Sequence, residues 1–172
     1  MTELESRLDE ISQSPAEEGR LEMIVRRPIS GEREILSEGE LTLEEGLSGD
    51  SWNKRSPRLD MQINIMNSRA IAVVAGTTER WPLAGDQLFI DLDLSETNLP
   101  PGTQLEVGAA RIEITAPPHT GCSKFAARFG VEATKFVNSP RGRQMNLRGR
   151  NARVVKAGRI RKGDAVRKIV EA

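Results

Sequence analysis

The chain has 172 residues, and its 25 lysines and arginines are balanced by 25 aspartates and glutamates. This length suits one domain with a single sizeable core, and the balanced charge gives no overall field that would favour a nucleic acid or an anionic membrane as partner. Aromatic residues make up only 3% of the chain, so the stacking surfaces of single-strand nucleic-acid binders are scarce. No apolar run approaches the ~20 residues of a membrane span and one cysteine forms no internal disulfide, which indicates a cytoplasmic protein.

Residues 1–19 are predicted to form a helical arm that precedes a β-rich domain at residues 20–172. Leu4, Leu8 and Ile11 recur at helical spacing, after a Thr-x-x-Glu capping box that begins at Thr2. A Ser-Pro pair and a glycine then end the helical pattern. The sequence leaves open whether this arm packs on the domain.

From residue 20 onward, short segments with a period of two dominate, and they are separated by glycine turns. In residues 60–66, for example, Met61, Ile63 and Ile65 share one face. The pattern predicts strands at residues 21–25, 34–36, 41–43, 60–66, 88–94, 104–107, 110–115, 152–160 and 164–170, and a helix at 67–76. It therefore favours a mainly β, barrel-like fold with a few short helices over a parallel α/β fold.

Residues 119–130 contain the only histidine, His119, and the only cysteine, Cys122. Thr120 is expected to cap a short helix that ends at Gly130, which places Cys122 in the first helical turn. Unpaired N–H groups there lower the pKa of a thiol from about 8.5 into the range ~3.5 to 7.5. A lone cysteine is also often a small buried hydrophobic residue, so residue chemistry alone leaves a reactive and a structural interpretation open.

Familiar chemical signatures are absent from the sequence. It has no phosphate-binding Gly-rich loop, no Cys-x-x-Cys, no His-Glu-x-x-His and no Gly-x-Ser-x-Gly. One cysteine and one histidine also leave a tetrahedral zinc site short of ligands. A Cys-His hydrolase pair is disfavoured, since residues three apart near a helix start seldom reach the required geometry.

The order of several motifs resembles the MOSC domain family, which is named for the C-terminal domain of molybdenum cofactor sulfurase. The likeness covers about residues 20–170. It rests on Arg27-Pro28 with Gly31 and Arg33, on Gly46-Leu47-Ser48-Gly49-Asp50, on Gly85-Asp86-Gln87-Leu88, on Asn98 through Gly102, on His119 through Gly130, on Arg148-Gly149, and on Gly158 with Gly163-Asp164.

The resemblance implies a compact barrel in which one cysteine carries sulfur as a persulfide or binds the metal of a molybdenum cofactor. The matching residue is Cys122, with His119 beside it as a second catalytic candidate. Some family members are joined to a pyridoxal-phosphate-dependent desulfurase domain, for which this chain has no room. A sulfur donor such as a cysteine desulfurase is therefore expected in trans.

Basic residues are expected to hold the phosphate of the cofactor, because arginine and lysine suit phosphate oxygens. The candidates are Lys124, Arg128, Arg141 and Arg148, and each has an alternative role on the surface or, for Arg148, in an ion pair. Asn98 is a candidate for binding the pterin edge and is also a typical turn former.

Two further sets of polar residues have a structural role as their favoured interpretation. Arg26, Arg27 and Arg33 suit an anion site, although a solvated surface cluster is the favoured interpretation. Asp50 and Asp86 each follow a glycine, so their expected role is to cap a turn.

The leading hypothesis is a stand-alone MOSC-type domain that binds the molybdenum cofactor or carries sulfur on Cys122. One alternative is a non-catalytic cofactor-binding or delivery module, which a buried Cys122 without an adjacent cavity would favour. Another is a molybdenum-dependent reductase of N-hydroxylated compounds, which would need an electron-transfer protein in trans. The sequence leaves open whether the chain is an enzyme.

Overall fold

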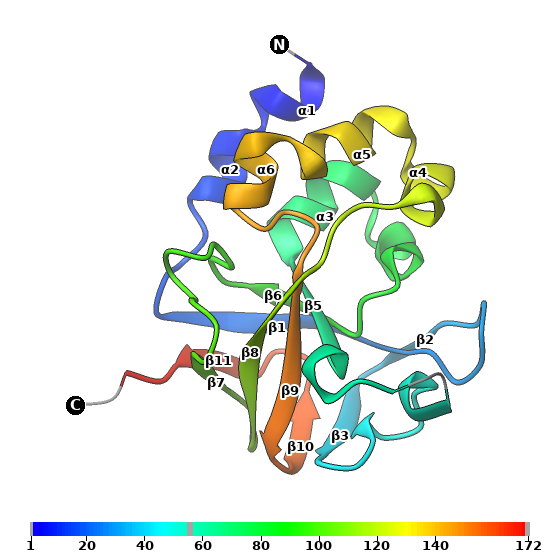
Figure 1. The fold of residues 1–172 in the computed structure, drawn as a ribbon, viewed down its shortest axis with the longest axis vertical. Coiled ribbons are helices and arrows are strands. Elements are labelled where there is room, and N and C mark those ends of the chain that lie inside the picture. Colours follow the sequence, from blue (N-terminus) through cyan, green and yellow to red (C-terminus); the bar gives the residue numbers. More distant parts are fainter. Residues whose placement is uncertain (1, 55–56, 171–172) are drawn as a thin grey trace.

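The computed structural model describes residues 2–54 and 57–170. Seven strands form a closed barrel in the order β11-β7-β8-β9-β5-β6-β1, and β1 pairs back with β11 (Figure 1). Only β5 and β6 pair in parallel among these neighbours, so the barrel is mixed. The barrel strands are β1 (Glu18–Arg26), β5 (Ile63–Asn67), β6 (Leu88–Asp91), β7 (Gln104–Val107), β8 (Ala110–Pro118), β9 (Arg150–Lys156) and β11 (Ala165–Lys168). The mainly β, barrel-like fold expected from the sequence is confirmed.

The remaining strands lie beside the barrel. β2 (Glu34–Leu36) pairs with the end of β1, and β10 (Gly158–Arg161), β3 (Glu38–Thr42) and β4 (Gly46–Leu47) form a small sheet of their own.

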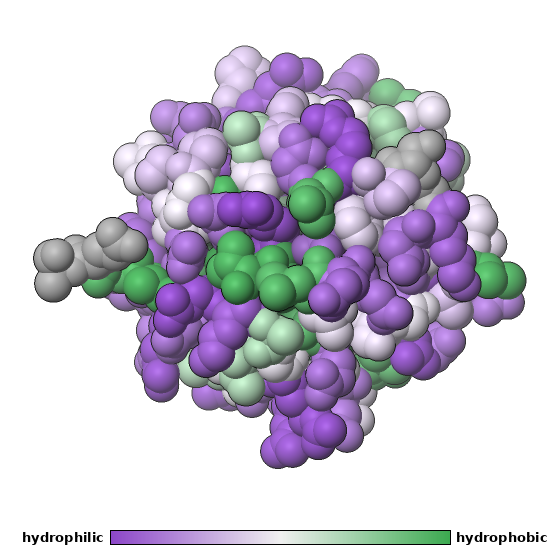
Figure 2. Space-filling view, turned by 60° about the horizontal axis from the view of Figure 1, so that its bottom comes forward, coloured by the Kyte–Doolittle hydropathy of each residue, from purple (hydrophilic) through white to green (hydrophobic). Residues whose placement is uncertain are grey.

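The surface in Figure 2 is mostly hydrophilic, with an apolar patch near its middle.

The helices gather at one end of the barrel (Figure 1). They are α1 (Glu3–Ser6), α2 (Leu8–Ser12), α3 (Ser68–Ala75), α4 (Ser123–Phe129), α5 (Val131–Asn138) and α6 (Pro140–Gln144), with short 3-10 turns η1 (Trp52–Lys54), η2 (Leu59–Met61) and η3 (Thr78–Ala84). Within the described part of the chain, none of the helices is both long and apolar enough to cross a bilayer.

Strand alternation creates two apolar cores. On β1, Leu21 and Ile24 are buried in the barrel interior, whereas Met23 and Val25 pack under the helices. Burial of apolar surface on both faces stabilises the barrel and fixes the helical layer at the same time. Ile11 of α2 belongs to the helical core, so the N-terminal arm packs on the domain.

The expected strand at residues 60–66 is wrong in its first half. Residues up to Met61 form the turn η2, and the Met61 side chain is exposed. The cause is Gln62, whose buried side chain donates to the carbonyl of Leu43 and accepts the N–H of Val154. These two backbone groups belong to other segments of the chain. Their hydrogen bonds to the Gln62 side chain stabilise the turn more than the alternation of apolar residues would stabilise a longer strand.

Two other expected elements are divided. The helix at residues 2–12 breaks at Arg7 into α1 and α2, although the capping box at Thr2 is confirmed. The strand at residues 152–160 breaks before Gly158 into β9 and β10, which belong to different sheets. A Cβ at Gly158 would overlap the backbone of Ala109, so this close passage requires glycine. The helix α3, its cap Asn67 and its end at Gly76 match the prediction.

Candidate functional site

The register of the barrel brings three distant segments together at its helical end. Pro118 at the end of β8 lies opposite Arg150 at the start of β9, so His119 lies near Gly149, where an added Cβ would come within 3.3 Å of the His119 Nδ1 atom. Asp86 enters from the segment before β6. A cluster results in which Asp86 and Arg148 are buried and His119 is partly buried.

Arg148 is fixed from three sides. Its Nη1 donates to Asp86 at 2.6 Å, its Nη2 donates to the carbonyl of Ala84, and its guanidinium carbon lies 5.0 Å from the centre of the Phe125 ring. The Arg148 side chain is 8% exposed and that of Asp86 is fully buried. Phe125 belongs to α4, so this arginine links the cluster to the helix that begins beside Cys122.

His119 is held in the neutral form. Its pKa is lowered to about 4, chiefly by burial, with Asp86 acting in the opposite direction and the charges of Arg148 and Arg27 adding smaller decreases. The Nδ1 atom of His119 lies 3.8 Å from Asp86 Oδ2, too far for a direct hydrogen bond. Within the described residues, both of these buried atoms lack a hydrogen-bond partner.

Cys122 is exposed and immediately precedes α4. The expected cap at Thr120 is wrong, because the chain stays extended through Pro118 and the residue at the N-cap position is Cys122. The backbone N–H groups of Phe125, chiefly, and of Lys124 lower the pKa of the thiol. Burial opposes this shift and is second only to the Phe125 N–H group in size, while the charges of Arg148 and Lys124 lower the pKa by smaller amounts.

An amide clamp positions the cysteine. The Asn138 side chain accepts the N–H of Gly121 at 2.9 Å and donates to the carbonyl of the same residue at 2.9 Å. Both backbone groups of the residue before Cys122 are therefore fixed to α5. A Cβ on Gly121 would lie 3.0 Å from Val137, so the clamp also depends on a small residue there.

Cys122 borders a cavity of about 190 Å³ whose lining is rich in positive charge. Five cationic side chains line it, namely Arg27, Arg33, Lys124, Arg128 and Arg148. Two of them have buried carboxylate partners, since Arg27 pairs with Asp50 at 2.7 Å and Arg148 with Asp86. Among the described residues no ion pair joins Lys124 or Arg128 to a carboxylate, which leaves the cavity with an excess of positive charge.

The structure brings together five of the seven residues selected from the sequence. His119, Cys122, Lys124, Arg128 and Arg148 all line this cavity. Arg148 also has the acidic partner that the sequence interpretation offered as its alternative role.

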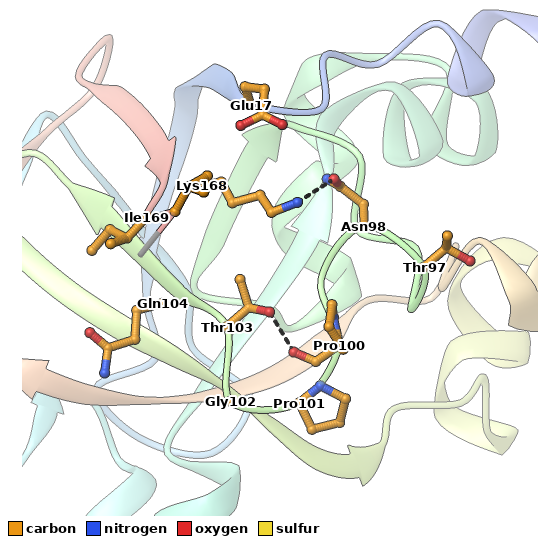
Figure 3. A pocket seen from close by; sticks show the side chains of 11 residues that line it. Glu17, Thr97, Asn98, Pro100, Pro101, Gly102, Thr103, Gln104, Lys168 and Ile169 are labelled. Carbon is orange, nitrogen blue, oxygen red and sulfur yellow. Dashed lines mark hydrogen bonds between the residues drawn. The ribbon is translucent and has the colours of Figure 1, made fainter. Parts of the chain in front are cut away.

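Arg141 and Asn98 lie elsewhere. Arg141 is exposed on α6, outside the cavity lining. Asn98 lines a separate, larger depression of about 660 Å³, where it accepts a hydrogen bond from Lys168 (Figure 3). The Asn98 amide donates to the carbonyls of Ala16 and Asp93, which matches its alternative role as a loop former.

Sequence reasoning underestimated two acids and missed Asn138. Asp50 does cap its turn by accepting the N–H of Trp52, as expected, but Asp50 and Asp86 are each also a buried partner of a cavity arginine. These aspartates were selected because each follows a glycine, and a Gly-Asp pair in a sequence does not indicate whether the carboxylate is buried. Of the early arginine cluster, Arg27 and Arg33 line the cavity, whereas Arg26 pairs with Glu34.

Comparison with known proteins decides the family. The family model of the MOSC domain matches residues 46–167, well over half of the chain. The chain belongs to the MOSC domain family. The match begins after β1, yet β1 is a barrel strand of this MOSC domain.

Solved structures share the fold of this MOSC domain. YiiM from Escherichia coli is similar with a TM-score of 0.58 and 19% identity, covering 89% of this chain and 71% of that one. The YUAD protein from Bacillus subtilis is similar with a TM-score of 0.60 and 15% identity, covering 87% of this chain and 94% of that one. A protein described as hypothetical has a TM-score of 0.61 and 19% identity, covering 90% of this chain and 68% of that one. No curated protein matches the chain in sequence.

Proposed function

We propose that this MOSC domain carries sulfur as a persulfide on Cys122, binds the molybdenum cofactor there, or does both. The observation that supports the proposal is the position of Cys122: an exposed thiol with a lowered pKa beside a cavity with five cationic side chains. A thiolate is the form of cysteine that accepts sulfur and binds a soft metal.

The residues present fit the anionic end of such a cofactor. The cavity of about 190 Å³ is smaller than the ~300–1,000 Å³ typical of pockets that bury a whole small molecule. A phosphate group would occupy it, and the remainder of a larger ligand would extend over the rim. Arg33, Lys124 and Arg128 are the side chains that would hold the phosphate.

The protein would supply a single ligand to the metal. Among residues 2–54 and 57–170, no group of three or more His, Cys, Asp and Glu side chains is placed to hold a metal ion. Cys122 is therefore the one protein ligand proposed, and the bound cofactor would supply redox-active molybdenum with its own sulfur ligands. Neutral His119, on the cavity wall, would add no charge to the cavity at neutral pH.

The proposed partners supply sulfur and electrons. Sulfur would come from a donor in trans, such as a cysteine desulfurase, and a reductive reaction would need an electron-transfer protein. A cytoplasmic location suits this chemistry, because thiols stay reduced there. A delivery module without chemistry at the sulfur would suit a buried Cys122, whereas this side chain is exposed beside a cavity.

The test offers the protein either sulfur or the molybdenum cofactor in parallel experiments. The purified protein is incubated with a cysteine desulfurase and cysteine, or with isolated molybdenum cofactor, and then assayed for cyanolysable sulfur and for bound pterin. We expect the wild type to carry cyanolysable sulfur, bound pterin or both, and we expect Cys122→Ser to lose what the wild type carries. The absence of both loads from the wild type would refute the proposal.

A further inference from the structure

We propose that the sulfur donor is a small oxyanion that carries sulfane sulfur, of the thiosulfate class, and that it binds in the cationic cavity beside Cys122. The inference rests on the proposed sulfur-carrying function. It adds a donor class and a binding site for that donor, so that loading does not require a protein desulfurase.

Volume and charge select this class of donor. A cavity of about 190 Å³ suits a compact tetrahedral anion better than a peptide or an extended organic persulfide. The excess of positive charge favours a doubly charged anion over a neutral or singly charged one. The larger depression around Asn98 offers one lysine, Lys168, together with the carboxylate of Glu17, so it lacks this selectivity.

Two guanidinium groups approach the same point of the cavity wall. A Cβ built on Gly85 would lie 3.6 Å from Arg33 Nη2 and 3.8 Å from Arg128 Nη1. Both guanidinium groups line the cavity, so an anion bound there is attracted by both positive charges. Gly85 itself has φ of +88°, a backbone conformation that favours glycine in this part of the wall.

A buried donor on the same wall has no partner. The side chain of Arg148 is nine-tenths buried, and its Nε has no hydrogen-bond partner in the described part of the chain, although Nη1 and Nη2 are both bonded. A buried N–H group left unpaired costs stability, and an oxyanion satisfies it once a small shift of the wall opens this atom to the cavity. This donor is independent of the cysteine and points to a ligand with oxygen acceptors.

The sulfur transfer balances without an added oxidant or reductant. The thiolate of Cys122 forms an S–S bond to the outer sulfur of thiosulfate. The S–S bond within thiosulfate breaks, and its electron pair leaves with the sulfite. Cys122 becomes a persulfide anion, so no proton is consumed. Arg33, Lys124 and Arg128 are placed to stabilise the charge on the leaving sulfite.

The first experiment compares donors on the full chain. Reduced protein is incubated with thiosulfate, with benzenethiosulfonate as a bulkier monoanion, or with cysteine plus a cysteine desulfurase. Sulfite release and a mass increase of one sulfur atom on Cys122 are measured, and cyanide is then added to convert the persulfide to thiocyanate. We expect thiosulfate to load Cys122 with a KM that rises with salt, and benzenethiosulfonate to be at least about tenfold less efficient.

The second experiment tests the cavity with matched charge changes. Arg128→Gln and Lys124→Gln are each expected to raise the KM for thiosulfate about tenfold, because each removes a charged donor. Lys135→Gln is the control, since Lys135 is an exposed lysine on the neighbouring helix α5 and lies outside the cavity lining. Its KM should stay within about twofold of the wild type.

The outcomes separate the inference from the function on which it rests. Loading by the desulfurase without loading by thiosulfate would overturn the donor class and leave the proposed function standing. Loading by neither would refute the donor class and the sulfur-carrying function on which it rests, whereas cofactor binding is decided by the assay for bound pterin. Thiosulfate loading that responds equally to Lys124, Arg128 and Lys135 substitutions would overturn the cavity as the binding site.

Discussion

Asp86 and Arg148 form a 2.6 Å ion pair between two buried side chains, and this pair links the barrel to the helix that presents Cys122. Asp86 comes from the segment before β6, and Arg148 comes from the turn just before β9 and packs on Phe125 of α4. The pair therefore joins three parts of the chain that are distant in sequence.

Asp86→Asn should destabilise the protein by about 3–5 kcal/mol, because it leaves the buried guanidinium of Arg148 without its charged partner. Urea unfolding measures the change. Glu113→Gln serves as control, since Glu113 also pairs with an arginine at 2.7 Å but on a partly exposed face of the barrel. Its cost should stay near or below about 1 kcal/mol. Equal costs for the two variants would contradict the structural role given to Asp86.

The sequence predicted the architecture well where local rules act. The alternation of Leu88 and Ile90 matches the barrel interior, and Asn67 with Gly76 bounds α3 as expected. Apolar periodicity and caps are properties of neighbouring residues, so they can be read from the chain. The predicted start of the strand at residue 60 was wrong because the Gln62 side chain bonds to backbone groups that lie far away in sequence.

The candidate site was predictable to the extent that it is local. His119, Cys122, Lys124 and Arg128 lie within one short segment, and rare residue types drew attention to it. The supporting residues come from elsewhere: Asp86 pairs across 62 positions and Asn138 clamps across 17. Such partners are set by barrel register and helix packing, and neither is visible in a single sequence.

The neutral state of His119 predicts a pH-dependent stability. Its pKa is about 4 in the folded protein against 6.5 as the ordinary value, so between these two pH values the unfolded chain binds a proton that the folded chain does not. The free energy of unfolding should therefore fall as the pH is lowered from about 6.5 to about 4, by up to about 3 kcal/mol from this group. His119→Gln should flatten this part of the curve, whereas identical curves would exclude His119 as the cause.

The same pKa is directly measurable, because His119 is the only histidine in the chain. Its ring proton resonance in an NMR titration can be assigned without ambiguity. We expect a midpoint near pH 4 in the folded protein. A midpoint near 6.5 would show that the ring is solvated and that Arg27 and Arg148 do not act on it.

Cys122 should react faster than an ordinary thiol at neutral pH. The N–H groups of Phe125 and Lys124 lower its pKa, so the midpoint of the iodoacetamide rate against pH should lie below the value of about 8.5 for a free thiol. Lys124→Gln should raise the midpoint, while leaving the larger effect of the backbone in place. Glutathione labelled in the same series provides the reference, and coincident midpoints would count against an activated thiolate.

Asn138→Ala should affect Cys122 more than it affects the fold. It removes both bonds to Gly121, at a cost of about 1–3 kcal/mol, and it should change the labelling rate and the sulfur loading of Cys122. Ser139→Ala is a matched control on the next residue, since it removes the hydroxyl that caps α6 and costs about 0.5–2 kcal/mol. If both variants alter Cys122 to the same extent, the clamp has no specific positioning role.

Gly149→Ala should be among the most damaging small substitutions in the chain. Gly149 has φ of +127°, and a Cβ there would overlap the carbonyl of Ile65 and lie 3.0 Å from Asp86 Oδ2. Backbone strain and displacement of Asp86 would act together, so we expect a loss of about 4 kcal/mol or more in the free energy of unfolding. Gly76→Ala separates these causes, because Gly76 has φ of +81° with open space around its Cβ position and should cost only about 1–2 kcal/mol. If the losses in free energy of unfolding differ by less than about 1 kcal/mol between the two variants, the residues around Asp86 move to accommodate the added methyl group. The cluster would then be less rigid than its contacts imply.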